Sequence, residues 1–180
     1  MTTRPRRRRD RRRRRQPAPV AVVRTHSHND HVNAAPALAA RYCAPILPHP
    51  ADAVPWKTAH GLRVPGFWEL NDGEDLIVAG IEPWVPHTPG HSPGSVCLYV
   101  SELGAPFSGD TPFQGGPGAT GRSFSDFDTV IASIRDRLLT LPADTTVHAG
   151  RGPTTSIGAE ALHLDEWIAR GHDCLSRSRR

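Results

Sequence analysis

The residues with the clearest chemical potential lie in one short segment, residues 25–31, which reads THSHNDH. In an extended chain, residues two apart project to the same side, so we expect His26, His28 and Asp30 to converge on one point. His31 follows as the chain turns into a helix. Three imidazoles and a carboxylate in so short a span are typical of a zinc site, or of an iron or manganese site where oxygen ligands are more numerous. The segment therefore predicts a metal centre that holds one or two ions.

Two later segments carry further candidate ligands. Residues 87–95 read HTPGHSPGS, a loop stiffened by glycine and proline in which only one of His87 and His91 needs to point inward. Asp110 directly follows a short predicted strand, and Gly109 before it permits a close approach of the backbone. An SGD tripeptide is weak evidence alone. Here it adds to a set of ligand-type residues whose members follow successive strands.

Short apolar runs and one amphipathic segment predict the elements that position these residues. The first strand, 20–25, runs directly into the histidine segment, and a helix over 32–42 follows with Pro36 in its first turn. An apolar face over 125–139 predicts an amphipathic helix, capped by Ser123 or Ser125. The other predictions are strands over 44–47, 75–79, 81–85, 95–100, 106–108 and 145–148 and a last helix over 157–170. Strands and helices alternate, which favours a layered α/β domain.

The charge of the chain is divided unevenly. Residues 1–20 hold ten arginines and one aspartate, a charge of +9, so the formal net charge of +4 leaves −5 for the rest. Such an arm would attract nucleic acid or anionic surfaces without specificity and with strong salt dependence. Two other interpretations stay open: a disordered tail without an assigned role, and an upstream stretch translated from a misplaced start. We divide the chain into a disordered arginine-rich tail (1–19), one domain (20–172) and a basic C-terminal tail (173–180).

The remaining composition predicts the compartment. No apolar run approaches the roughly 18 residues that a membrane helix needs, so no membrane partner is expected. The basic start is not followed by an apolar stretch and a cleavage site, as a secretory signal would be. The three cysteines form no CxxC pair and leave one over in any disulfide scheme. A reduced, cytoplasmic compartment is therefore expected.

The motifs THxHxDH, HTPGHSPGS and SGDT, in this order, resemble those of the metallo-β-lactamase superfamily. Within it they are most similar to the glyoxalase II-like (hydroxyacylglutathione hydrolase-like) hydrolases. The resemblance extends over nearly all of the predicted domain and implies an αββα sandwich. It also implies a first metal ion at His26, His28 and His91, a second at Asp30 and His31, and Asp110 as the bridge between them.

The resemblance further implies hydrolysis at a carbonyl carbon. Two cations about 3.5–4 Å apart would lower the pKa of a shared water towards neutrality, and a metal would polarise the carbonyl oxygen. Asp30 and Asp110 would orient the attacking hydroxide and are the expected catalytic residues. Substrates in the superfamily include thioesters, lactams, lactones and phosphodiesters, and the fold decides the reaction type better than the substrate. We expect a small thioester or a related ester.

Two features depart from the family pattern. The last metal ligand of the family is a histidine in a Gly-His-Gly-Pro turn, and the matching position here is Arg151, which stays protonated and cannot bind a metal. His148, three residues earlier, is the candidate that replaces it if the loop shifts. The arginine run also stands where the family has further strands, since only one predicted strand precedes His26. We therefore expect a truncated or mis-started member that lacks its N-terminal strands.

Two other functions stay open beside the hydrolase. A truncated chain with an impaired second metal site would be inactive or weakly active. A nucleic-acid-processing hydrolase is supported by the arginine-rich arm alone and disfavoured by the acidic charge of the rest. Arg122, in a glycine-rich segment after Asp110, is a candidate contact for a substrate anion.

Overall fold

The computed structural model describes residues 21–61, 68–74, 76–77, 80–121 and 123–171. In these ranges the helices are α1 (Asn29–Val32), α2 (Ala35–Tyr42), η1 (Pro50–Asp52), α3 (Ala53–His60), η2 (Ser101–Leu103), α4 (Phe127–Ser133), η3 (Ile134–Leu138), α5 (Ile157–Ala161) and α6 (Leu164–Arg170). The strands are β1 (Val22–Val23), β2 (Ile46–Leu47), β3 (Leu98–Val100), β4 (Ala105–Gly109), β5 (Pro112–Phe113), β6 (Gly116–Pro117), β7 (Thr146–Ala149) and β8 (Thr155–Ser156). None of the described helices is long and apolar enough to cross a bilayer.

Three small sheets carry these strands. β1 and β2 pair in parallel, with Val22 opposite Ile46. The largest sheet has the order β3-β4-β7-β8, in which the central β4–β7 pair is parallel and the two outer pairs are antiparallel. β5 and β6 form a separate antiparallel pair. The β4–β7 pair matters most for function, because the carboxyl ends of parallel strands lie at one edge, where ligands of open α/β sheets commonly bind.

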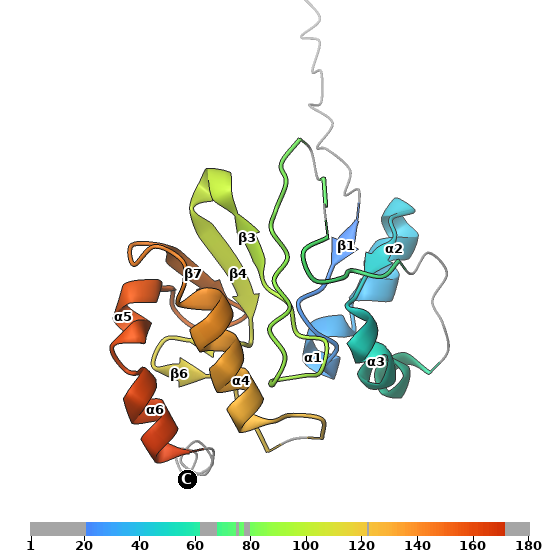
Figure 1. Ribbon diagram of the computed structural model, residues 1–180. Coiled ribbons are helices and arrows are strands. Elements are labelled where there is room, and N and C mark those ends of the chain that lie inside the picture. The colour runs from blue at the N-terminus through green and yellow to red at the C-terminus, as the bar shows by residue number, and fades with distance from the viewer. Residues whose placement is uncertain (1–20, 62–67, 75, 78–79, 122, 172–180) are drawn as a thin grey trace, which may run out of the picture.

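Helices cover the strands on two sides (Figure 1). α4, α5 and α6 pack on the four-stranded sheet, where Val147 and Trp167 share one buried apolar cluster. α1, α2 and α3 pack on β1 and β2, where Ile46, Val32 and Trp56 share another. Burial of apolar surface of this kind stabilises the fold by about 25 cal/mol per Å². The expected α/β layering is confirmed, and β1 is the one strand before His26 among the described residues.

The amphipathic helix predicted over 125–139 is present as two consecutive segments, α4 and the π-helical η3. Its apolar face is buried as expected, and Val130 has no exposed surface. Its N-terminal cap is Asp126, whose side chain accepts a hydrogen bond of 2.7 Å from the backbone N–H of Thr129. The cap predicted at Ser123 or Ser125 is therefore wrong. A carboxylate is the better acceptor at this end, since it also interacts favourably with the helix dipole.

Two other predicted elements differ from the structure. The strand predicted over 81–85 is absent; this stretch makes only isolated bridges, one of them between Trp84 and Tyr99. Pro83 inside the stretch and Pro86 directly after it lack the N–H groups that a ladder needs. The strand predicted over 75–79 falls largely on residues outside the described ranges. The last helix, predicted over 157–170, is interrupted between Ala161 and Leu164 and forms α5 and α6.

Candidate metal centre

Three histidines from two distant segments converge at one point. His26 follows β1, His28 stands at the N-cap of α1, and His91 lies in a loop before β3. Nδ1 of His28 lies 2.9 Å from Nε2 of His91. The ring centroid of His26 lies 4.9 Å from that of His28 and 4.8 Å from that of His91. One nitrogen from each ring lies within 4.8 Å of the other two, an arrangement that suits a tetrahedral cation such as zinc.

A second group of ligand-type side chains lies directly beside the first. It consists of His26, His31 and Asp110, whose ligand atoms also lie within 4.8 Å of one another. Nε2 of His31 lies 3.3 Å from Oδ1 of Asp110 and 3.9 Å from Oδ2 of Asp30. Nε2 of His91 lies 3.7 Å from Oδ2 of Asp110. The Asp110 carboxylate therefore faces both groups, one oxygen towards each.

Buried polar atoms mark the centre of the cluster. Nε2 of His26 and Oδ1 of Asp110 are buried and make no hydrogen bond with any described residue. Leaving a buried polar atom unpaired costs about 1–3 kcal/mol, and a cation bound between such atoms would remove that cost. On this ground the first group and the adjoining carboxylate fit a divalent metal ion.

The electrostatics hold these side chains in the forms that bind metals. Burial lowers the pKa of His26 far below its usual value, and it lowers the pKa of His91 to about 4. The hydrogen bond from Arg151 lowers the pKa of Asp30. Burial raises the pKa of Asp110, but the nearby imidazoles of His31 and His91 and the guanidinium of Arg151 lower it by more, so the net shift is downward. At neutral pH the imidazoles of His26 and His91 are thus neutral, and the carboxylates of Asp30 and Asp110 are ionised.

A buried carboxylate, Asp52, holds the loop that carries His91. Asp52 has no exposed surface. Its oxygens accept a hydrogen bond of 3.0 Å from Oγ of Ser92 and one of 2.6 Å from the backbone N–H of Gly94. Ser92 Oγ also lies 2.9 Å from Oγ of Ser95. The sequence analysis missed Asp52, because it lies in an irregular segment without a periodic pattern.

Arg24 is the second supporting residue that the sequence analysis missed. Its side chain is buried, and Nη2 donates to the backbone oxygen of His26 at 2.9 Å and to Oγ of Ser27 at 2.5 Å. Its guanidinium lies 4.2 Å from the centroid of the Trp56 ring. These contacts fix the backbone from which His26 projects. The only signal in the sequence is a charged residue that directly follows an apolar run.

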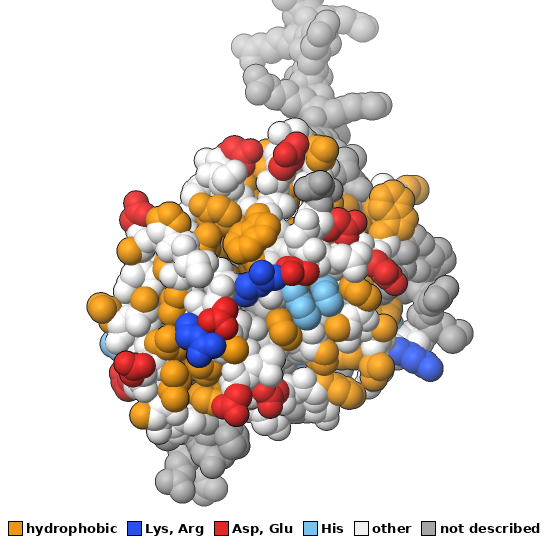
Figure 2. All heavy atoms as spheres, viewed as in Figure 1, with side chains coloured by type: hydrophobic (Ala, Val, Ile, Leu, Met, Phe, Trp, Pro, Cys, Tyr) orange, Lys and Arg blue, Asp and Glu red, His pale blue; other side chains and the backbone are white. Residues whose placement is uncertain are grey.

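Arg151, which the motif resemblance places at the family's last histidine, reaches into the second group. Its Nη2 donates a hydrogen bond to the carboxylate of Asp30. The same atom lies 3.0 Å from Nε2 of His31 and 3.5 Å from Oδ2 of Asp110. Figure 2 shows basic, acidic and histidine side chains next to one another near the middle of the surface that faces the viewer. The guanidinium therefore stands among the residues that would serve a second metal ion.

Two other candidate histidines lie apart from these groups. The ring of His148 stacks on that of Phe107, its partner on β4, with 5.4 Å between centroids. Nε2 of His87 lies 2.8 Å from the backbone oxygen of Pro93, and its ring stacks on His49 with 3.9 Å between centroids. Neither belongs to either group of ligand-type side chains among the described residues. Arg122 lies outside the described ranges.

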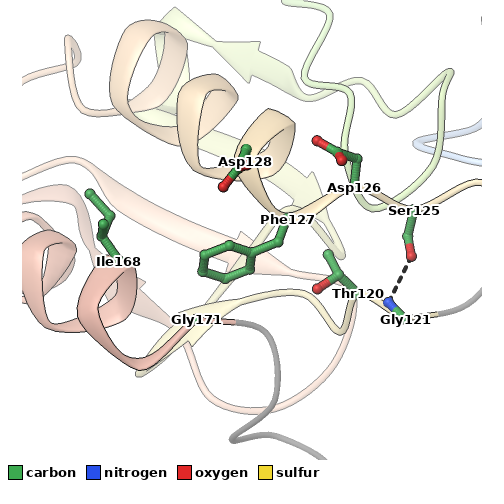
Figure 3. Close-up of a pocket in the computed structure, with 8 residues that line it drawn as sticks. All are labelled: Thr120, Gly121, Ser125, Asp126, Phe127, Asp128, Ile168 and Gly171. Atoms are coloured by element: carbon green, nitrogen blue, oxygen red, sulfur yellow. Dashed lines mark hydrogen bonds between the residues drawn. The ribbon is translucent and has the colours of Figure 1, made fainter.

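A separate cavity of about 430 Å³ lies between the start of α4 and the end of α6 (Figure 3). Its lining contains neither metal group. Inside it the backbone N–H of Gly121 donates a hydrogen bond of 2.9 Å to Oγ of Ser125. The lining residues are Thr120, Gly121, Ser125, Asp126, Phe127, Asp128, Ile168 and Gly171.

A layered α/β domain with a histidine and aspartate cluster at its strand ends defines a class of metal-binding proteins. The chain belongs to the metallo-beta-lactamase superfamily, whose family model matches residues 2–151. This is a superfamily of metallo-hydrolases with glyoxalase II-like members, so the resemblance noted from the motifs is confirmed.

Individual relatives agree with this assignment. Over 56 residues, which are 31% of this chain and 53% of the relative, it is 68% identical to an uncharacterized 11.5 kDa protein of Rhodococcus erythropolis. It is 35% identical over 149 residues to the hydroxyacylglutathione hydrolase GloC of Haemophilus influenzae. This alignment covers 76% of this chain and 70% of that protein. The crystal structure of TTHA1623 in a di-iron-bound form superposes with a TM-score of 0.69 at 37% identity, over 79% of this chain and 75% of that one. The chain thus spans about half of the first relative and 70% of the second.

Proposed function

We propose that the chain is a metal-dependent hydrolase that acts at the carbonyl carbon of a small thioester or a related ester. The observation that carries the proposal is the convergence of His26, His28 and His91 beside the buried carboxylate of Asp110. The superfamily and the relative named as a hydroxyacylglutathione hydrolase support the same reaction class.

The metal would be held by the three histidines, with Asp110 at its edge. A divalent cation bound there would supply a Lewis acid and lower the pKa of a water molecule towards neutrality. Zinc is the first choice, because three of the donors are imidazoles. Iron and manganese are the alternatives, since carboxylates adjoin the site, and the TTHA1623 structure is described as di-iron-bound.

The other residues of the centre would orient the attacking water. Oδ1 of Asp110 makes no hydrogen bond with the described residues and is free to accept a proton from that water. Asp30 would hold the water from the other side, while Arg151 keeps its carboxylate in place. Nδ1 of His91 lies 3.0 Å from the backbone oxygen of Ala119, which fixes the orientation of this ring. Asp30 and Asp110 are accordingly the proposed catalytic residues.

The proposal is tested with protein purified without added metal. Elemental analysis measures bound metal, and a panel of small thioesters and lactones measures turnover. Asp110→Asn is expected to lower kcat by about 100-fold or more, because it removes the group that accepts the proton. His91→Ala is expected to lower the metal content. The control is His163→Ala, an exposed histidine paired with Glu166. A folded protein without metal, or turnover unchanged in Asp110→Asn, would overturn the proposal.

The second candidate function is a chain that binds metal with weak or no turnover. Arg151 favours it, since this residue displaces a ligand that the family uses. Bound metal without turnover of any substrate in the panel would support this candidate against the first.

The expected partner is a small molecule, and we infer a reducing, cytoplasmic compartment from the unpaired cysteines Cys43 and Cys97. Contact with nucleic acid would be non-specific and would depend on residues 1–19. Binding to duplex DNA should then fall steeply with salt and disappear when these residues are removed. Retention after their removal would contradict this inference.

A further inference from the structure

We propose that the guanidinium of Arg151 takes the place of the second metal ion, so that the centre holds one metal at His26, His28 and His91 beside a permanent organic cation. The inference rests on the metal site of the proposed function. It goes further in assigning a role to Arg151 and in fixing the number of ions.

The position of Nη2 of Arg151 supports this role of the guanidinium. Nη2 of Arg151 contacts three side chains at once: it donates to the carboxylate of Asp30 and lies 3.0 Å from Nε2 of His31 and 3.5 Å from Oδ2 of Asp110. These are the residues that the family resemblance assigns to the second ion. A positively charged nitrogen therefore stands where that ion would stand, and it pairs with the Asp30 carboxylate that would otherwise attract one.

The backbone positions Arg151 beside the second group of ligand-type side chains. β4 and β7 are parallel, with Gly109 opposite Ala149, so Asp110 and the turn after β7 leave the sheet together. The N–H of Gly150 donates a hydrogen bond of 2.6 Å to the backbone oxygen of Gly109. A Cβ at Gly150 would come within 2.6 Å of Oδ1 of Asp110. The turn is thus seated directly against the carboxylate, and the next side chain projects over the second group.

The chemistry of the arginine side chain also disfavours a second metal ion. A guanidinium remains charged over the whole range in which proteins are folded and has no lone pair to offer a metal. It removes one ligand from the second position and repels a cation that approaches it. A histidine at this place would add a neutral donor without adding charge. The first position keeps all three of its histidines.

The test is the metal content of five proteins after dialysis against zinc: the wild type, three single variants and one double variant. The wild type should hold about one equivalent, and Arg151→His, which restores a donor, should hold about two. Arg151→Lys is the matched control: it keeps the charge and offers no neutral donor, so it should stay at one. Circular dichroism of the metal-free proteins confirms that each variant is folded.

The variant Asp30→Asn provides a second test that does not require Arg151→His to fold. In the wild-type background Asp30 pairs with Arg151 and not with a metal, so Asp30→Asn should leave one equivalent bound. Combined with Arg151→His, the same change should reduce two equivalents to about one, because Asp30 is then a ligand.

The outcomes separate the two proposals. Three outcomes would each overturn the role of Arg151 without contradicting the proposed hydrolase function. They are two equivalents of metal in the wild type, one equivalent in Arg151→His, and loss of the metal in Asp30→Asn alone. No metal in any of the folded proteins would overturn the hydrolase itself, and with it this inference. One equivalent in the wild type and two in Arg151→His would support it.

Discussion

The backbone N–H of Gly94 donates a hydrogen bond of 2.6 Å to Oδ1 of Asp52, a carboxylate without exposed surface that lies 42 residues earlier in the chain. Oδ2 accepts a second hydrogen bond from Ser92, the residue that follows His91. Loop and carboxylate are so close that a Cβ at Gly94 would come within 2.7 Å of the Asp52 side chain. Asp52 thereby holds the loop that carries His91, a candidate metal ligand.

Asp52→Ala is expected to lower the free energy of unfolding by about 3 kcal/mol, because it removes two buried hydrogen bonds and leaves the N–H of Gly94 without a partner. Urea unfolding followed by circular dichroism measures the change. Asp144→Ala removes an exposed carboxylate and should alter the free energy by less than about 0.5 kcal/mol. Equal values for the two variants would show that Asp52 does not hold the loop.

Gly90 is expected to tolerate no side chain. Its φ is +125°, and a Cβ would overlap the backbone of Val130 in the middle of α4. Gly104 also has a positive φ, +58°, but a Cβ there would meet nothing within 4 Å. Gly90→Ala should therefore lower the free energy of unfolding by about 3 kcal/mol or more, through overlap and strain together, and Gly104→Ala by about 1 kcal/mol through strain alone. Similar losses in the two variants would contradict the packing of this loop against α4.

The two described cysteines should differ in reactivity. Burial raises the pKa of the Cys97 thiol to about 12 from its usual value of 9.0, whereas Cys43 is exposed. Iodoacetamide at pH 8 should modify Cys43 and leave Cys97 intact until the protein unfolds, as peptide mass spectrometry would detect. Because the folded state favours the protonated thiol, its contribution to stability is complete below pH 9 and is lost as the pH rises towards 12. Rapid labelling of Cys97 in the folded protein would contradict its burial.

Zinc is expected to raise the melting temperature through the three-histidine group. A ligand at a hundredfold excess over its Kd stabilises the folded state by about 2.7 kcal/mol. Scanning calorimetry with and without zinc should show this shift in the wild type and in His163→Ala, but not in His26→Ala. A shift of the same size in His26→Ala would place the bound metal elsewhere.

Much of the candidate site could be predicted from the sequence because its signals are local. His26 and His28 are two residues apart, and Asp30 and His31 follow at once, so a short extended segment and one helical turn suffice to bring them near. Asp110 and His91 were found by residue type and motif order. These two residues lie near the first segment only because strands pair. The family resemblance could imply that proximity, but the local spacing of residues could not.

The wrong predictions have a common cause. Over 81–85 the apolar pattern indicated a strand, but Pro83 and the adjoining Pro86 lack backbone N–H groups that a ladder needs. The cap of α4 is Asp126 and not a serine, because the choice among neighbouring polar residues depends on where the first turn closes. Both are decided by hydrogen-bond geometry that the periodicity of side chains does not contain.

The sequence by itself predicted that this chain belongs to a family with a metal centre, which residues are its candidate ligands by type, and that an arginine stands at one of the expected ligand positions. Only the tertiary structure decided what that arginine does. The contacts of Arg151 with Asp30 and His31 join residues 121 and 120 positions apart. Contacts of this range arise when the ends of β4 and β7 are brought to one edge, and no local propensity encodes them. The same holds for Arg24 and Asp52, whose roles exist only because folding buries them beneath the histidines.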